Sequence, residues 1–395
     1  MKAILIYPLY RRPKPTNEVE AVGYLAKGAM VDVLKIDAGA ALEGISIWMF
    51  ANDGYWYWGG GLEMNISNKF MEWQQLSKDQ KISVVTSIVN DESNWIEKKV
   101  VDYRGCAVGY KNDDLSADIG LSIFVEDKAD VTTFGKAFFW KGIEVPVDFK
   151  RTGDIEEQLK FVDNYADNSF PQRVGGSIKE QNSSSIGTRS MVLFREEAGK
   201  NIYYVATCFH VLLNSYKGLN VNFDALHPVL LMKKKVRYPA VKIPNIKEFS
   251  ELPIESAIYN EKNDFCLVRL PDKFNMVNRI EGSPTINFND FHRFKGLQSL
   301  LGKTLTMSGA KSGKQIGVVK DTNGKIKFKS SPVEFVNIII TEPMSSPGDS
   351  GAPVVDNMNK LVGIVIGGDE EKRTYILPVF GFLIDFNLKL KNGFL

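Results

Sequence analysis

Ser350 lies in a segment that could present a nucleophile. The surrounding residues read Ser-Pro-Gly-Asp-Ser-Gly-Ala-Pro-Val, and glycines on both sides would leave the hydroxyl accessible on a tight turn. A serine hydroxyl is a weak nucleophile, so it needs a base within about 3 Å and room for the carbonyl that it attacks. The segment therefore predicts acyl-transfer chemistry, against the simpler alternative of a polar turn between two strands.

The base can be sought among only three histidines. His210 ends a strand-like apolar run that begins at Asn201, whereas His227 and His292 lie in loop-like segments and are interpreted as surface or structural residues. Taken alone, His210 could also be a buried structural histidine. Its occurrence together with the Ser350 segment favours a catalytic role.

A carboxylate should orient the imidazole and stabilise its charged form. Asp264 precedes the apolar run 265–270 and fits this role, whereas Glu255 and Glu261 lack a following buried strand. The order histidine, acid, serine differs from the order in α/β-hydrolases and in subtilisins. An α/β-hydrolase is also disfavoured because Ala352 stands where its Gly-x-Ser-x-Gly motif has the second glycine.

Together these motifs resemble those of the trypsin-like, chymotrypsin-fold serine peptidases, over roughly the last half of the chain. The Gly-Asp-Ser-Gly turn, the Thr-Cys-Phe-His run ending at His210 and the Asp-Phe-Cys-Leu run starting at Asp264 carry the resemblance. Cys208 and Phe209 stand where small residues are usual in the family, and Cys266 replaces an alanine. The resemblance implies a double β-barrel with the triad between the barrels, and neither a metal nor an organic cofactor.

Further site residues are implied by the same resemblance. The backbone N–H groups of Gly348 and Ser350 would form the oxyanion hole. Met344 would form the base of the primary pocket, with the strand residues Ile366, Gly367 and Gly368 as one wall. Because no acid occupies that base, an apolar or aromatic residue is expected before the scissile bond, although several acids lie nearby in sequence.

A possible activation site precedes the peptidase motifs. Arg173, Val174 and two glycines resemble the sequence at which secreted relatives are cleaved, after which the new amine pairs with the aspartate before the serine, here Asp349. The simpler alternative is a flexible linker that contains an arginine by chance.

Residues 1–65 show short strand-like runs punctuated by glycines. The segments Gly23–Gly28, Val31–Leu34 and Gly54–Leu62 resemble a bacterial SH3-like domain. The four aromatics Tyr55–Trp58 could line a peptide groove for a regulatory partner or pack a small core. Both interpretations remain open from the sequence.

The middle of the chain predicts smaller parts. Residues 66–100 suit a helical connector with a break at Asn90–Ser93, and residues 101–165 suit a small α/β module. Pieces of this module resemble a segment that precedes the peptidase domain in a group of bacterial trypsin-like proteins. The polar stretch Asp163–Ser185 is the best linker candidate, and residues 166–395 would form the peptidase domain.

The composition and the N-terminal sequence indicate in which compartment the protein works and which partners are not expected. Lysine and arginine number 49 against 47 acidic residues, which does not indicate nucleic-acid binding. No apolar run approaches the ~20 residues of a membrane helix. The N-terminus lacks a signal-peptide cleavage site, and the three cysteines form neither a disulfide framework nor a metal-ligand spacing. These features favour a cytoplasmic protein.

The sequence therefore predicts a mainly β, intracellular and regulated serine endopeptidase that acts on protein or peptide substrates. A role in bacterial defence or a stress response, triggered against one dedicated partner, is one version of this hypothesis. The alternative is a catalytically silent or latent protein of the same fold that acts through its SH3-like domain.

Overall fold

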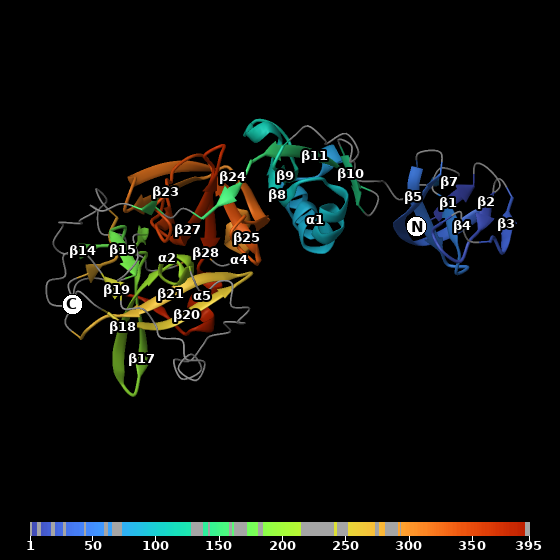
Figure 1. The fold of residues 1–395 in the computed structure, drawn as a ribbon. Coiled ribbons are helices and arrows are strands. Elements are labelled where there is room, and N and C mark those ends of the chain that lie inside the picture. The colour runs from blue at the N-terminus through green and yellow to red at the C-terminus, as the bar shows by residue number, and fades with distance from the viewer. Residues whose placement is uncertain are drawn as a thin grey trace. The chain divides into compact units, whose positions relative to one another are not determined.

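The computed structural model describes residues 2–391 apart from 6–8, 17–19, 27–28, 43–44, 59–61, 65–72, 128–136, 141–142, 158–159, 162–171, 181–184, 215–240, 243–251, 273–275, 281–290 and 293. In this part the chain is mainly β, which confirms the predicted fold class (Figure 1). It divides into two compact units, Met1–Leu76 with Phe139–Glu144, and Ser77–Phe138 with Val145–Leu395. No helix in the described ranges is long and apolar enough to cross a membrane.

The first unit contains a small antiparallel sheet in the order β6-β5-β4-β1-β7 and a separate β2–β3 pair. Its strands are β1 (Lys2–Leu5), β2 (Leu9–Arg11), β3 (Gly23–Leu25), β4 (Met30–Leu42), β5 (Ile45–Ala51), β6 (Trp56–Trp58) and β7 (Leu62–Met64). Tyr57 is fully buried and packs with Val31, Val33 and Met49, while Trp56 and Trp58 beside it are half-buried. At least one of the four aromatics therefore serves the core, and the SH3-like identity stays a prediction.

The second unit begins with helix α1 (Lys78–Lys99), which Ser77 and Gln80 cap reciprocally. The helix continues through Asn90–Ser93, where a break was expected from the turn preference of these residues. Its buried face, which includes Ile82, Ile88 and Ile96, packs on β8 and β9. The segment is thus part of the adjoining α/β layer and does not form a separate connector. The helix continues through Asn90–Ser93 because burial of its apolar face outweighs the turn preference of these four residues.

Six antiparallel strands of the C-terminal half close into a barrel. They pair in the order β24-β23-β26-β27-β28-β25, and β25 pairs back to β24. The strands are β23 (Thr304–Gly309), β24 (Gly313–Lys327), β25 (Glu334–Thr341), β26 (Pro353–Asp356), β27 (Leu361–Asp369) and β28 (Thr374–Pro378). Leu305, Met307, Val319 and Ile339 lie in its core, so alternate residues of several strands fill the interior.

Strands β13–β22, which precede this barrel in sequence, and the C-terminal strand β29 form the sheets β20-β21-β18-β17-β29 and β13-β16-β15-β19 and the pair β14–β22. Their bounds are β13 (Lys160–Phe161), β14 (Gln172–Arg173), β15 (Ser177–Glu180), β16 (Ser185–Thr188), β17 (Val192–Glu197), β18 (Lys200–Thr207), β19 (Val241–Lys242), β20 (Ile254–Asn260), β21 (Asn263–Arg269), β22 (Met276–Val277) and β29 (Lys389–Leu390). Val205, Phe209 and Leu267 belong to their shared core. Residues 172–173 and 177–180, inside the expected linker, thus form strands, and its remaining residues are partly outside the described ranges.

The α/β layer is continuous with the closed barrel. Its strands are β8 (Tyr103–Tyr110), β9 (Ile119–Val125) and the part of β11 (Ile143–Arg151) from Val145 on. The strand β10 (Ala137–Trp140) spans the boundary between the two units in sequence. β8 pairs antiparallel with β24, with Gly109 opposite Asp321, and β9 pairs parallel with β11. A Cβ on Gly109 would lie 1.6 Å from the Asp321 carboxylate, so only glycine permits this approach. The layer and the barrel therefore share one sheet.

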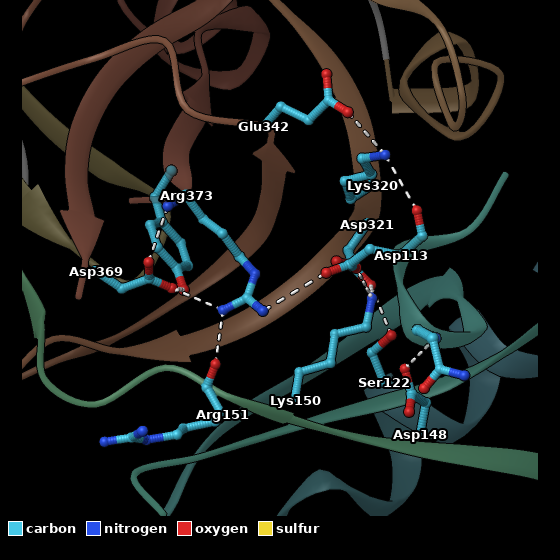
Figure 2. Close-up of polar contacts among 12 residues, drawn as sticks. Asp113, Ser122, Asp148, Lys150, Arg151, Lys320, Asp321, Glu342, Asp369 and Arg373 are labelled. Atoms are coloured by element: carbon cyan, nitrogen blue, oxygen red, sulfur yellow. Dashed lines mark hydrogen bonds and ion pairs between the residues drawn. The ribbon is translucent and has the colours of Figure 1, made fainter. Parts of the chain in front are cut away.

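A buried ion cluster lies at this junction (Figure 2). The Lys150 ammonium is 2.7 Å from Asp321 and 2.6 Å from Asp113, and Ser122 donates a hydrogen bond of 2.6 Å to Asp321. Burial disfavours the charge on Lys150, but the two carboxylates outweigh this effect and raise its pKa. Arg373 extends the cluster by contacting Asp113.

Candidate active site

His210 and Asp264 are brought together by neighbouring strands. β18 ends at Thr207, and the following short helix α2 (Phe209–Leu213) carries His210. β21 pairs with β18 and carries Asp264 at its start. The Asp264 carboxylate accepts the backbone N–H of His210 at 3.1 Å and lies 2.6 Å from Nδ1. When the carboxylate is ionised and the imidazole neutral, this contact requires the proton on Nδ1 and leaves Nε2 as the acceptor.

The Ser350 turn lies against the start of α2 through shared partners. The Thr188 N–H donates to the Ser350 carbonyl at 2.7 Å, and the Thr207 hydroxyl donates to the Thr188 carbonyl at 2.7 Å. The Gly351 N–H and the Cys208 thiol both bond to the Val365 carbonyl. The structure thus places the nucleophile candidate beside the helix that carries the base.

Gly351 is required for this close packing. Its φ is +93°, and a Cβ there would lie 2.2 Å from the Thr188 carbonyl oxygen. The glycine after the serine therefore has a steric reason in addition to exposure of the hydroxyl.

The reactive groups are buried and unpaired within the described ranges. Ser350 Oγ and His210 Nε2 make no hydrogen bond there, and both residues have 0% exposure. The backbone N–H groups of Gly348 and Ser350 likewise donate to no described residue. Unpaired buried polar groups are costly and rare, so these groups are candidates for binding a reacting group. The Oγ–Nε2 hydrogen bond of a closed triad is not formed in this state.

Asp349 points away from this centre. Its carboxylate accepts the backbone N–H groups of Lys311, Ser312 and Ser346 at 2.8, 3.0 and 2.8 Å. These three N–H groups already serve as hydrogen-bond donors to the Asp349 carboxylate. The new amine that cleavage after Arg173 would supply is therefore not needed as a partner for this carboxylate.

The expected pocket residues occupy two different environments. Met344 lies in the core of the closed barrel, its sulfur 3.0 Å from where a Cβ on Gly317 would be. Ile366, Gly367 and Gly368 lie on β27, and Ile366 is fully buried. A Cβ on Gly367 would lie 2.3 Å from the ring of Phe328. Met344 therefore contributes to the barrel interior, and the β27 positions are covered in this state.

Glu157 also reaches the site. Its side chain is 3% exposed, and its carboxylate lies 3.7 Å from His210 Nδ1. The Tyr259 hydroxyl is 3.4 Å from the same carboxylate, and the Ser330 hydroxyl is 3.2 Å from it. Because Glu157 belongs to no sequence motif, reasoning from the sequence did not identify it, and only its three-dimensional position does.

A metal would fit poorly among the candidate residues. Ligand atoms of Cys208, His210 and Asp264 lie within 4.8 Å of one another. However, the direct 2.6 Å contact between His210 and Asp264 is shorter than the separation of about 3 Å expected for two ligands of one ion. The expected absence of a metal cofactor stays a prediction.

Comparison with known proteins gives likenesses to solved structures. No family model and no curated protein matches the chain. Thermobifida fusca Protease A is 17% identical, with 56% of this chain and 98% of that chain covered and a TM-score of 0.39. Cellulomonas bogoriensis chymotrypsin is 15% identical, with 56% of this chain and 98% of that chain covered and a TM-score of 0.37. A glutamic acid specific serine protease is 16% identical, with 55% of this chain and 100% of that chain covered and a TM-score of 0.40. At such identities and TM-scores, activity must be inferred from the geometry of the site.

Proposed function

We propose that this protein is a serine endopeptidase with Ser350 as nucleophile, His210 as general base and Asp264 as the residue that orients the base. The observation that carries this proposal is the double contact of Asp264 with His210. It fixes the imidazole so that Nε2 is the nitrogen free to take the proton of Ser350.

The chemistry follows from these positions. Ser350 Oγ attacks the peptide carbonyl, its proton passes to His210 Nε2, and Asp264 stabilises the imidazolium. The oxyanion accepts the N–H groups of Gly348 and Ser350, each worth roughly 3 kcal/mol of barrier in comparable sites. The imidazolium then protonates the leaving amine, and a water molecule activated by His210 hydrolyses the acyl-enzyme.

The proposed setting is a reducing compartment, the cytoplasm, because Cys106, Cys208 and Cys266 are all free and buried. The substrates are proteins or peptides. A site with no exposed surface at Ser350 supports a regulated enzyme, since substrate can enter only after a local opening.

Labelling with a fluorophosphonate probe tests the proposal. We expect intact mass to show one adduct on the wild-type protein and none on Ser350→Ala or His210→Ala. Ser190→Ala is the matched control, because it removes another buried serine hydroxyl that has no partner in the described ranges. Its labelling should equal that of the wild type.

A second measurement separates the forms of this hypothesis. Cleavage of unfolded casein by unmodified protein from a preparation that reacts with the probe would indicate broad specificity. Reaction with the probe without casein cleavage would indicate one dedicated substrate. A folded protein that never labels, even after the strand described below is displaced, would contradict the peptidase and favour a binding protein.

A further inference from the structure

One edge of β27 changes partner along its length. β26 pairs with it up to Ile364, and Gly351 and Ala352 bond to Val365 next. Farther along, the short strand β12 (Ile155–Glu156) pairs antiparallel with Asp369 and Gly368. Since β28 already pairs with the opposite edge at Gly368, β12 lies on the same edge as the Ser350 turn.

The direction of β12 points it at the reactive centre. Antiparallel pairing means that the chain from Ile155 to Glu157 runs along β27 toward Val365, which bonds to the serine turn. Glu157 is the next residue after the strand, and its carboxylate is 3.7 Å from His210 Nδ1. The segment therefore reaches the histidine from the strand edge.

Buried and exposed side chains alternate along this segment, as they do in an extended peptide bound to a sheet edge. Ile155 has 0% exposure and packs in the core, Glu156 faces solvent, and the Glu157 side chain is buried again. The Glu156 carbonyl oxygen would lie 2.4 Å from a Cβ on Gly367, so glycine permits the backbone to approach. Addition of an extended peptide to a sheet edge is a recurring mode of peptide recognition.

The backbone orientation of β12 supports the same interpretation. The Ile155 carbonyl accepts the N–H of Lys329, on the side away from β27. Because N–H and C=O groups alternate along a strand, the corresponding groups of Glu156 face β27 opposite Gly368. Main-chain pairing at this position is what a substrate peptide would use.

We infer that Ile155–Glu157 is a resident, substrate-like strand that occupies the peptide-binding edge of β27 and keeps the site closed until it is displaced. This inference rests on the proposed peptidase function. It also assigns the substrate class: an extended segment with a branched apolar residue two positions before an acidic residue. Tyr259 and Ser330, which now contact the Glu157 carboxylate, would hold that acidic side chain.

The residues before β12 connect it to the α/β layer. β11 ends at Arg151, whose carbonyl accepts a hydrogen bond of 2.7 Å from Arg373 (Figure 2). The Thr152 carbonyl accepts the N–H of Glu370, and Gly153 adopts φ +61°. A displacement of β11 would be carried to β12 through this short turn, so the layer is the proposed route for a trigger.

Replacing Glu156 by proline tests the strand. Proline removes the N–H that faces β27, and Glu156→Ala is the matched control because it removes the same exposed side chain and keeps the N–H. If the competent open state is a minor fraction, we expect Glu156→Pro to react with the fluorophosphonate about tenfold faster or more, with Glu156→Ala unchanged. Thermal unfolding would show that both variants are folded.

A peptide with the sequence of residues 153–158, added in trans, should slow the labelling of Glu156→Pro again. Fluorogenic peptides carrying Ile-x-Glu should be cleaved better by this variant than those carrying Ile-x-Lys, and Tyr259→Phe should reduce the difference. Equal labelling of wild type and Glu156→Pro would overturn the resident strand and leave the peptidase intact. No labelling of any folded variant would instead overturn the peptidase itself.

Discussion

Lys150 and Asp321 form an ion pair of 2.7 Å between the α/β layer and the closed barrel, with side-chain exposures of 3% and 0%. The pair joins β11 to β24, and Asp113 contributes a second carboxylate to the same ammonium. Removing charges from water is unfavourable, so such a cluster is sensitive to the loss of any one partner.

Lys150→Met should strongly destabilise the protein, because the Asp321 carboxylate, with 0% side-chain exposure, would remain buried without its cation. We expect a loss of about 3–5 kcal/mol in the free energy of unfolding, measured with urea. Lys150→Met combined with Asp321→Leu should recover part of this loss. Lys329→Ala, which breaks an exposed pair with Asp154, is the control and should unfold like the wild type.

The Lys150 cluster also predicts a pH dependence. The pKa of the Lys150 ammonium is raised above the usual 10.5, because the attraction of Asp321 and Asp113 outweighs the opposing effect of burial. A raised folded-state pKa contributes stability that is present below the unfolded value and lost as pH rises through the folded value. The free energy of unfolding of the wild type, measured with urea, should therefore fall above pH 10.5. The Lys150→Met variant should show a smaller decrease over the same pH range.

Asp264→Asn should reduce kcat by about 10⁴-fold, because the amide no longer fixes the imidazole tautomer with Nε2 as the acceptor. Asp356→Asn is the matched control. It alters the other buried pair, in which His292 Nε2 is 2.8 Å from Asp356. We expect it to change the thermal midpoint and leave the rate of labelling within about twofold of wild type. Equal losses of labelling in the two variants would argue against the assigned orienting role.

Gly351→Ala should abolish labelling, because the new Cβ would meet the Thr188 carbonyl and the positive φ would be strained. Gly199→Ala provides the comparison, since Gly199 has φ +77° with nothing within 4 Å of its Cβ position. That variant should lose only the roughly 1–2 kcal/mol of left-handed strain and should label normally. Unimpaired labelling of Gly351→Ala would contradict the packing of the serine turn.

Arg173→Gln should label at the wild-type rate, because Asp349 already accepts three backbone N–H groups. Mass spectrometry would confirm that the labelled chain still begins before residue 173. If labelling required cleavage after Arg173, the activation site suggested by the sequence would be correct after all.

The prediction of the candidate triad rests on short motifs. His210, Asp264 and Ser350 each stand at a boundary between an apolar run and a turn, and that boundary is readable locally. Glu157 could not be predicted, because its contact with His210 depends on the pairing of a two-residue strand with β27. The helix through Asn90–Ser93 was missed because the burial of Ile88 and Ile96 against β8 and β9 is a tertiary effect.

The long strand β24 also sets the order of events during synthesis. β8 emerges with α1 and β9 early, whereas its partner on the other side, β24, is made much later, as the pair Gly109 and Asp321 shows. Until then β8 has an open row of backbone donors and acceptors, which is the kind of edge that recruits other chains. A nascent or truncated chain that ends before Gly313 would therefore be prone to associate, and long-range pairing of this kind folds slowly.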